Sequence, residues 1–215
     1  MAVIGEIKRR SPSKGTLNAS IDAGAQAAAF ERGGAAAISV LTEPTFFDGT
    51  IDDLRAARAA VRLPILKKDF HVDVSQLVEA HQASATAVLL IARALSPDEL
   101  PKLMTAAREL GLETVVEVRT EEELSRAVEA GAEIIGVNSR DLETLEVDER
   151  VPERLMQQIP PGTVRIWESG IRDVKDVERA AACGADAVLV GSTLSQAADP
   201  AGLLASLRGV ARRHG

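Results

Sequence analysis

Hydrophobic and polar positions follow one repeated order along the chain, a short apolar segment and then a longer amphipathic one. The short segments contain many β-branched residues, which is typical of buried strands. They predict strands over residues 3–8, 36–41, 64–69, 86–91, 113–118, 133–138, 164–168 and 186–191. The longer segments are rich in Ala, Leu, Glu and Arg. They predict helices over residues 22–32, 51–61, 74–83, 97–110, 120–130, 149–158, 173–183 and 200–212.

One turn pattern recurs where a helix gives way to a strand. The segments ERGGAAAISVL, EAGAEIIGVNS and AACGADAVLVGS each end a helix at a glycine and then enter a buried strand. HQASATAVLLIA repeats the pattern with Ser84 in place of the glycine. Eight strand–helix units in 215 residues predict a single-domain (β/α)8 TIM barrel over residues 1–215. A doubly wound open sheet is the competing architecture, but no G-x-G-x-x-G motif follows any strand.

Composition excludes several classes of protein. The chain is 46% hydrophobic, which is enough for one sizeable core. Its formal net charge is −7 with a pI near 5.1, and no basic stripe is present, so we expect no nucleic-acid partner. The longest apolar runs, such as residues 87–92, are too short to cross a bilayer, and the start lacks the pattern of a signal peptide. We therefore expect no membrane partner.

Cysteine and histidine usage adds two expectations. The single cysteine, Cys183, excludes an internal disulfide and suits the reducing cytoplasm. It stands at a predicted helix end, where we expect a small packing residue rather than a nucleophile. The three histidines, His71, His81 and His214, lack the spacing of a zinc site, so no metal is expected.

Polar residues collect at the carboxyl ends of the predicted strands, where such barrels carry their chemistry. They are Glu6, Lys8, Lys67 or Lys68, Glu117, Asn138, Arg140, Glu168, Ser169, Gly191 and Ser192. Glu6 and Lys8 share one strand face because side chains alternate, but alternation alone does not decide between the two lysines. Neighbouring opposite charges should keep the acids ionised and the lysines protonated, with desolvation acting against both. The set predicts a polar pocket that can donate and accept protons, with structural ion pairs as the alternative.

Two glycine turns predict a phosphate site near the last two strands. The seventh strand leads into Ser169-Gly170-Ile171, and the eighth leads into Gly191-Ser192-Thr193 and a short helical turn. Glycine lets the backbone approach an anion closely, and the loops after these two strands commonly bind phosphate in TIM barrels. The segment Ser11-Pro12-Ser13-Lys14-Gly15, after the first strand, adds hydroxyls and a cation.

Eight segments resemble, in the same order, the sequence blocks of the indole-3-glycerol phosphate synthase family of tryptophan biosynthesis. They are EIKRRSPSKG, ISVLTEPTFFDG, ILKKDF, VLLIARAL, VEVRTEEEL, GVNSRDLETLEVD, ESGI and VLVGSTL. The resemblance covers nearly the whole chain, and ILKKDF and NSRDLETLEVD are its most specific parts. It implies conversion of a phosphorylated 2-carboxyphenylamino deoxyribulose into indole-3-glycerol phosphate. The ring closes, carbon dioxide leaves and then water leaves, with no cofactor.

The resemblance also implies a role for each candidate residue. Lys68 matches the general acid, Glu117 the acid/base that completes dehydration, and Lys8 the lysine that contacts the substrate carboxylate and assists proton transfer. Glu6 and Asn138 match residues that hold the substrate hydroxyls and Lys8, and Glu168 matches a further active-site carboxylate. Arg140 matches a binding residue that supports the acid/base network. Ser11, Ser169, Gly170, Gly191 and Ser192 match phosphate contacts, whereas Phe47, Phe70 and Leu89 match apolar walls around the aromatic ring.

Two features depart from the family pattern. Five residues precede Glu6, where the family usually has a helical extension that covers the active site. We therefore expect either a truncated chain or a minimal barrel with a wetter pocket. Trp167 stands where a small residue is commoner, and we expect it to pack against helices outside the barrel, with Glu168 pointing inward. The alternative is that Trp167 alters the pocket.

The main hypothesis is an active synthase that works as a monomer or weak homodimer. One alternative is a truncated or diverged paralogue that binds a phosphorylated ligand with little or no turnover. A second is an isomerase of phosphoribosyl anthranilate, which usually relies on a cysteine near the first strand, where this chain has Glu6 and Lys8. A third is a Schiff-base aldolase that uses Lys68.

Overall fold

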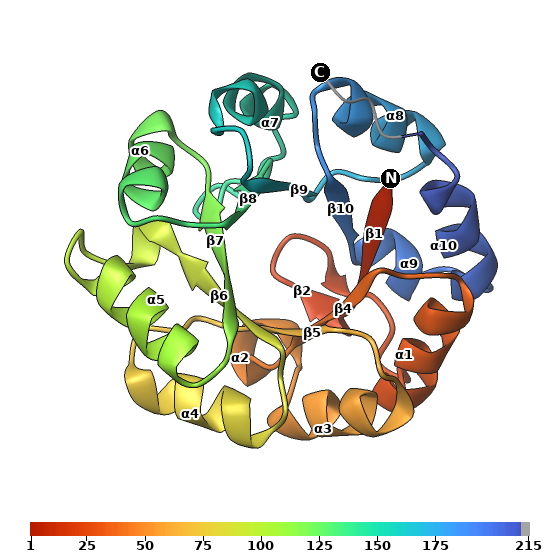
Figure 1. Cartoon of the computed structure of the whole chain (residues 1–215). Helices are drawn as coiled ribbons and strands as arrows, with labels where there is room; N and C mark the ends of the chain where they lie inside the picture. Colours follow the sequence, from red (N-terminus) through yellow and green to blue (C-terminus); the bar gives the residue numbers. More distant parts are fainter. Residues whose placement is uncertain (212–215) are drawn as a thin grey trace.

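The computed structural model describes residues 1–211 and folds them around a closed barrel of parallel strands (Figure 1). The strands are β1 (Ala2–Ile7), β4 (Ala37–Leu41), β5 (Ile65–Lys68), β6 (Ala87–Ile91), β7 (Glu113–Val118), β8 (Ile134–Asn138), β9 (Val164–Glu168) and β10 (Ala187–Val190). They run around the barrel in chain order, and β10 closes it by pairing with β1. The predicted strands and the TIM barrel are therefore confirmed, and the open sheet is wrong.

Helices follow the strands and surround the barrel (Figure 1). They are α1 (Ala23–Arg32), α3 (Ile51–Ala60), α4 (Val74–Gln82), α5 (Glu99–Glu109), α6 (Glu121–Glu129), α7 (Arg150–Leu155) with η2 (Met156–Gln158), α8 (Val174–Ala182) and α10 (Pro200–Arg208). Each overlaps a predicted helix. The pattern predicts the fourth from residue 97, but α5 begins at Glu99, whose carboxylate accepts the Ser96 backbone N–H at 2.7 Å. Residue 212, the predicted end of the last helix, lies outside the described residues.

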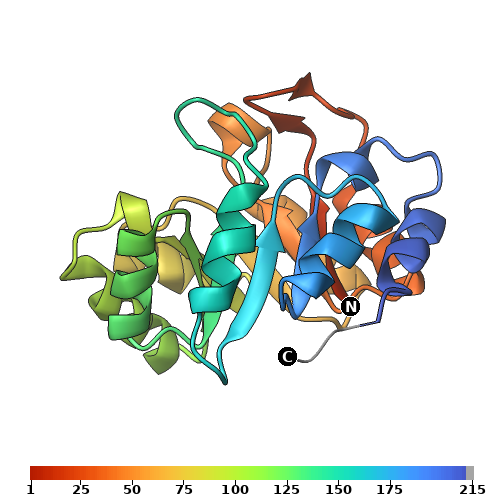
Figure 2. The ribbon, with the colours of Figure 1, turned by 90° about the horizontal axis from the view of Figure 1, so that it is seen from above.

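Several short elements at the carboxyl ends of the strands are not predicted by the sequence pattern. They are a hairpin of β2 (Arg10–Ser11) and β3 (Gly15–Thr16), the helix α2 (Pro44–Phe47), and the turn η1 (Ala92–Ala94). The short helical turn expected after the last strand is present as α9 (Ser192–Ser195). Figure 2 shows the hairpin, α2 and the loop between β8 and α7 at one end of the barrel, with residue 1 toward the other. This loop-covered end is called the mouth below.

The recurring helix-to-strand turn is confirmed by its backbone conformation. Gly34, Gly131 and Gly184 have φ angles of 83°, 79° and 86°, which belong to the left-handed region. Ser84, the predicted stand-in for a glycine, adopts the same conformation with φ 62°. The left-handed residue reverses the chain after each helix and lets a buried strand begin within a few residues.

Hydrophobic side chains pack on both sides of the barrel wall. The outer core fills the space between strands and helices and contains Phe30, Leu77 and Trp167. Trp167 is 2% exposed, so it packs outside the barrel as expected. The inner core contains Ile4, Leu66, Leu89, Ile91, Val115, Ile166, Ala187 and Leu189.

The strand registers stack the inward side chains in levels, because alternate strands of a tilted barrel contribute to the same level. One level consists of Glu6 (β1), Lys68 (β5), Glu117 (β7) and Glu168 (β9). The level beneath it consists of Ser39, Leu89, Gly136 and Leu189, and the next of Ile4, Leu66, Val115 and Ile166. Four ionisable residues thus form a complete level, called the charged level below, above levels that are mostly apolar.

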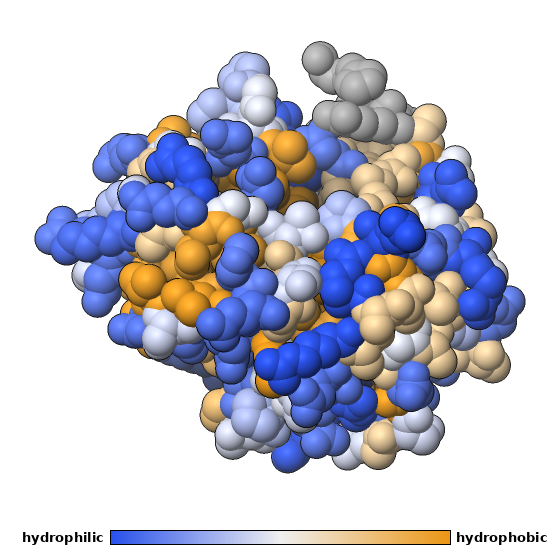
Figure 3. Space-filling view, turned by 60° about the horizontal axis from the view of Figure 1, so that its bottom comes forward, coloured by the Kyte–Doolittle hydropathy of each residue, from blue (hydrophilic) through white to orange (hydrophobic). Residues whose placement is uncertain are grey.

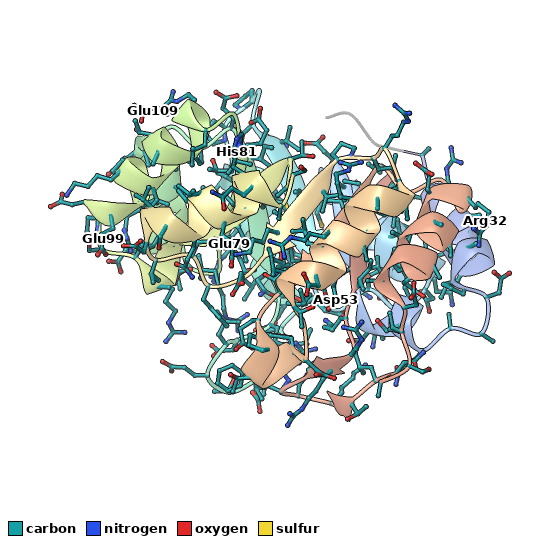
Figure 4. All side chains as sticks on the ribbon, turned by 90° about the horizontal axis from the view of Figure 1, so that it is seen from below. Arg32, Asp53, Glu79, His81, Glu99 and Glu109 are labelled. Atoms are coloured by element: carbon teal, nitrogen blue, oxygen red, sulfur yellow. The ribbon has the colours of Figure 1, made fainter. Side chains whose placement is uncertain are left out.

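An ion pair connects the end of β1 to the start of α3. The Arg9 guanidinium donates to both carboxylate oxygens of Asp53, at 2.6 and 2.7 Å. The same carboxylate accepts the backbone N–H of Thr50 at 3.0 Å and closes the helix cap. Figure 4 shows Asp53 at the end of α3 that faces the hairpin. Because Lys8 and Ser11 stand beside Arg9 in the chain, this pair fixes the start of the hairpin over the mouth.

Replacing Asp53 by Asn is expected to lower the free energy of unfolding by about 1–2 kcal/mol, because a charge-assisted but partly solvent-screened hydrogen-bond pair is lost. Burial raises the pKa of Asp53, but the opposing effect of Arg9 and Thr50 is stronger and leaves this pKa below its usual range. A depressed carboxyl pKa stabilises the fold above the unfolded-state value of about 3.9, and the benefit is lost as the pH falls through the folded-state pKa. Urea unfolding at pH 7 and at pH 3 should therefore show a smaller difference at pH 3.

Asp52→Asn is the matched control, because Asp52 pairs with Arg55 at 2.7 Å but its side chain is 82% exposed. It is expected to change the free energy of unfolding by less than about 0.5 kcal/mol. Equal losses in the two variants would contradict the assignment of a stabilising role to the Arg9–Asp53 pair.

The outer faces of the helices mix hydrophobic and hydrophilic residues, as Figure 3 shows for the side that carries α3 and α4. Within residues 1–211, no helix is long and apolar enough to cross a membrane. Cys183 is the C-cap of α8, packs against the outer core and is half-buried, and burial raises the pKa of its thiol. These contacts fit the expected packing role.

Candidate active site

One cavity of about 630 Å3 opens at the mouth of the barrel. Its wall includes every predicted site residue: Glu6, Lys8, Ser11, Phe47, Lys68, Phe70, Leu89, Glu117, Asn138, Arg140, Glu168, Ser169, Gly170, Gly191 and Ser192. The carboxyl ends of the strands and the loops that follow them hold these side chains, as the barrel topology requires. The structure therefore brings together groups that lie far apart in the sequence.

The charged level forms the polar floor of this cavity. The Lys68 ammonium donates to a Glu117 carboxylate oxygen at 3.1 Å and lies 3.4 Å from a Glu168 carboxylate oxygen. Burial alone would lower the pKa of Lys68, but Glu117, Glu168 and Glu6 more than compensate and raise it. Lys68 is therefore protonated at neutral pH and can donate a proton to a bound molecule.

The two carboxylates beside Lys68 differ in protonation. Burial raises the pKa of Glu117, but the Lys68 charge and a hydrogen bond from the Asn138 amide at 3.1 Å have a larger, lowering effect. The pKa of Glu117 is therefore below its usual range, and Glu117 is ionised. Burial raises the pKa of Glu168 to about 8, with the Glu117 charge adding to this rise and Lys68 opposing it. The expectation that every acid in the pocket is ionised is therefore wrong for Glu168, because one ammonium does not offset two buried carboxylates.

Strand geometry decides between the adjacent lysines of β5. Lys67 is 1% exposed and points outward, where its ammonium lies 2.7 Å from Glu79 of α4 and 3.5 Å from Asp69. Figure 4 shows Glu79 on α4. Lys68, the next residue, points into the cavity. The structure therefore assigns the inward position to Lys68 and makes Lys67 part of a structural ion pair.

Glu6 and Lys8 meet at the mouth, as the shared strand face predicts. The Lys8 ammonium lies 2.7 Å from a Glu6 carboxylate oxygen. Gly191 leaves room for this pair, because a Cβ at that position would lie 2.2 Å from the carboxylate and 3.0 Å from the ammonium. The pair presents a cation beside a carboxylate at the edge of the charged level.

The predicted phosphate segments lie together on one side of the cavity. Ser169 and Gly170 are successive left-handed residues with φ angles of 65° and 80°, a backbone form that can turn N–H groups toward an anion. The Thr193 hydroxyl donates to the Ile171 carbonyl at 2.8 Å and connects the two glycine loops. Ser11 is buried, and its hydroxyl oxygen accepts the Lys14 backbone N–H at 3.2 Å. Hydroxyls, turns and the Lys14 cation from these segments thus all line the cavity.

Apolar side chains line the rest of the mouth. The rings of Phe47 and Phe70 lie 6.5 Å apart, centre to centre, at an angle of 41°. Leu89 contributes to the floor, and Phe46 and Leu142 extend the apolar rim. The last two were missed by sequence reasoning, although the Glu43-Pro44 pair is a helix-start signal that could have revealed the helix carrying Phe46.

Arg140 lies in the cavity wall, and its side chain forms its hydrogen bond with the loop that it belongs to. Its guanidinium donates to the Leu145 carbonyl at 2.6 Å, and its backbone pairs with Val147 in an isolated bridge. Its backbone N–H donates to the Asn138 side-chain oxygen at 3.0 Å, while the amide nitrogen of Asn138 donates to Glu117. Arg140 is thus connected to the acid/base groups through Asn138.

Among residues 1–211, no cluster of His, Cys, Asp and Glu side chains could hold a metal ion. His71 is buried, with Nδ1 2.8 Å from the Leu89 carbonyl, and burial lowers its pKa to about 4. His214 lies outside the described residues. The cavity itself contains a protonated lysine, an ionised carboxylate and a second, readily protonated carboxyl. Such a set can supply and remove protons around one bound molecule.

The sequence is similar to those of known proteins along most of its length. The sequence model of the indole-3-glycerol phosphate synthase family matches residues 1–207. The indole-3-glycerol phosphate synthase of Mycobacteroides abscessus is 48% identical over 207 residues, covering 96% of this chain and 76% of the relative. That of Kineococcus radiotolerans is 50% identical over 205 residues, covering 95% of this chain and 75% of the relative.

A solved structure, the thiamine phosphate pyrophosphorylase from Pyrococcus furiosus, superposes with a TM-score of 0.72. The match covers 97% of this chain and 94% of that one, at 16% sequence identity. At this identity the likeness shows a shared barrel fold and nothing about the reaction.

Proposed function

The chain belongs to the indole-3-glycerol phosphate synthase family, and from this premise we propose which residues of the mouth carry its reaction. It is a carboxy-lyase of tryptophan biosynthesis that acts on a phosphorylated substrate. The substrate carries an aromatic carboxylate at one end and a phosphate at the other, with hydroxyls and a carbonyl between them. Neither the isomerase nor the aldolase alternative fits this family.

The charged level is the observation that carries the proposal. Lys68 is the general acid: its ammonium protonates the substrate carbonyl oxygen while the ring carbon bonds to the carbonyl carbon. Carbon dioxide then leaves and its bonding electrons return to the ring. Lys68, reprotonated in between, protonates the hydroxyl that departs as water. Glu117, ionised beside it, accepts the proton that the ring system must lose to complete dehydration.

The neighbours of these two residues orient the substrate. Lys8 holds the aromatic carboxylate, while Glu6 and Asn138 hold Lys8 and the substrate hydroxyls, supported by the Glu6–Lys8 pair and the Asn138–Glu117 hydrogen bond. Glu168 acts as a protonated neighbour of Lys68, supported by its raised pKa. Arg140 holds the loop that follows Asn138 in place beside the substrate, supported by its hydrogen bond to the Leu145 carbonyl.

The apolar wall promotes loss of carbon dioxide. Phe47, Phe70 and Leu89 surround the aromatic ring with apolar surface. Transfer from water into such surroundings destabilises a carboxylate more than it destabilises the neutral carbon dioxide that the carboxylate becomes. The wall thus favours decarboxylation, while at its edges Lys68 donates protons and Lys8 binds the carboxylate.

The loops after β1, β9 and β10 bind the phosphate through Ser11, Ser169, Gly170, Gly191 and Ser192. The left-handed Ser169–Gly170 backbone, the hydroxyl groups and the Lys14 cation in the same wall support this placement.

Replacing Ser192 by Asp tests the phosphate end. The added carboxylate repels the substrate phosphate, so KM is expected to rise by about tenfold or more, a loss of at least ~1.4 kcal/mol of binding. The value of kcat should change little, because the charged level is untouched. Fluorescence of indole-3-glycerol phosphate formation gives both constants. Ser206→Asp adds the same charge on the exposed face of α10 and should leave KM unchanged. A KM for Ser192→Asp equal to that of Ser206→Asp would contradict the placement.

We further propose that the protein is one domain over residues 1–215, acts as a monomer or weak homodimer, and works in the cytoplasm. A single barrel with one surrounding layer of helices supports the domain proposal. The single half-buried cysteine supports a reducing compartment. Sedimentation over a range of concentrations would separate monomer from dimer.

A further inference from the structure

The level beneath the charged level contains one residue without a side chain. Gly136 stands in the middle of β8 (Ile134–Asn138) and is buried. The strand register pairs it with Glu117 on one side and Ile166 on the other. The other members of this level are Ser39, Leu89 and Leu189, so Gly136 leaves a gap on one side of this level, directly beneath the charged level.

The Glu168 carboxyl occupies this gap. A Cβ built on Gly136 would lie 2.0 Å from Glu168 Oε1, and its three nearest heavy atoms all belong to Glu168. The strand register pairs Glu168 with Asn138, two residues farther along β8. The Glu168 side chain therefore extends back along β8 and lies against the Gly136 backbone.

The two oxygens of this carboxyl have different surroundings. Oε2 lies 3.4 Å from the Lys68 ammonium. Oε1 is buried and has no hydrogen-bond partner among residues 1–211. One oxygen thus meets the general acid while the other fills the gap over Gly136, so the gap decides where the whole carboxyl can lie.

Backbone conformation does not require a glycine here. The φ angle of Gly136 lies outside the left-handed region, unlike those of Gly131 and Gly170. An alanine could therefore adopt the same strand conformation. What it could not do is coexist with Glu168 in its present position, because no real Cβ approaches an oxygen to 2.0 Å.

We propose that Gly136 is a positioning residue of the active site: the gap it leaves holds the Glu168 carboxyl beside Lys68. This inference rests on the proposed role of Glu168 in the reaction. It assigns Gly136 no contact with the substrate, since it acts only through the placement of that carboxyl. A side chain at position 136 would push the carboxyl upward, toward the cavity and away from its present contact with Lys68.

Gly136→Ala tests the proposal directly. The value of kcat is expected to fall about 10- to 100-fold, the range for displacement of a catalytic group by about 1 Å. KM should change by less than about threefold, because the phosphate and carboxylate ends of the site are untouched. The pH profile should also change: the inflection that Glu168 contributes near pH 8 should move to lower pH as the carboxyl becomes more hydrated. A purely structural role would not move this inflection.

Three further variants separate the possible outcomes. Glu168→Asp shortens the side chain, so adding Gly136→Ala to it should cost less than about threefold more in kcat. Gly24→Ala is the matched control: Gly24 lies on α1, and the atom nearest to an added Cβ would be 3.4 Å away, an ordinary contact distance. This variant should leave kcat and the pH profile unchanged. Glu168→Gln with full activity would remove the proposed role of Glu168, and the present inference with it.

The inference is overturned on its own if Glu168→Gln loses activity while Gly136→Ala keeps the parent kcat and pH profile. It is also overturned if the losses of Gly136→Ala and Glu168→Asp simply multiply. Should Gly136→Ala fail to fold, the double variant decides. Recovery of folding in Gly136→Ala/Glu168→Asp supports the contact, and absence of recovery contradicts it.

Discussion

Lys68→Ala is expected to reduce kcat roughly 100- to 10,000-fold, the contribution of a well-placed general acid. The ammonium that protonates the carbonyl oxygen is then lost, and water in its place is a much weaker acid. The fold should survive, because Lys68 lies in the wall of an open cavity and its removal leaves room for water. Single-turnover fluorescence of product formation, with circular dichroism as a check of folding, measures the two effects separately.

The adjacent Lys67 provides a matched control. It is the same residue type on the same strand, but its ammonium pairs with Glu79 outside the barrel. Lys67→Ala should lower the melting temperature, because Glu79 and Asp69 lose their partner, while turnover per folded molecule stays within about twofold of the parent. If Lys68→Ala instead unfolded the protein and kept its turnover per folded molecule, the lysine would be a structural ion-pair partner.

Glu117→Gln is expected to lower kcat roughly 100- to 10,000-fold, because the amide cannot accept the proton that Glu117 takes up. The substitution keeps the size of the side chain and an oxygen that can accept the Asn138 hydrogen bond, so stability should change little. KM should stay near the parent value if Glu117 acts in the chemical steps rather than in binding.

Loss of the Glu117 charge should also be visible in its neighbours. The Glu117 charge helps to raise the pKa of Glu168 to about 8, so this pKa should fall in the variant. The residual activity should then show its Glu168 inflection at lower pH than the parent. Glu143→Gln is the control, because Glu143 also lines the cavity but its side chain is 73% exposed and pairs with Arg93 at the rim. Equal activities of Glu117→Gln and Glu143→Gln would contradict the assignment.

The barrel was predictable because its signal is local and repeated. Each buried strand is an apolar run, each helix has its own start and stop signals, and Ser84 could be recognised as a left-handed residue from its place in the repeat. The site was predictable to the extent that it follows the fold. A polar residue at a strand end must reach the mouth if its side chain points inward, as Glu117 and Glu168 do.

What could not be predicted depends on distances between strands. Side-chain alternation could not choose between Lys67 and Lys68, because that choice needs the register of β5; the resemblance to the family named Lys68. The protonation of Glu168 depends on how many charges share one buried level. Gly136 has no sequence signal at all, because a glycine in a strand has the same appearance whether or not a carboxyl lies against it. The hairpin and α2 are too short to show periodicity.

The arrangement of the charged level has a consequence for the evolution of this protein. All of its members come from alternate strands, whereas the strands between them supply the level beneath. A change of the acid and base groups in this level could therefore be confined to four codons, while the apolar levels that stabilise the barrel remain as they are. New activities on this scaffold should arise more readily by exchange of the charged level and the mouth loops than by remodelling of the strands. Selection for stability and selection for chemistry would then act on largely separate sets of positions.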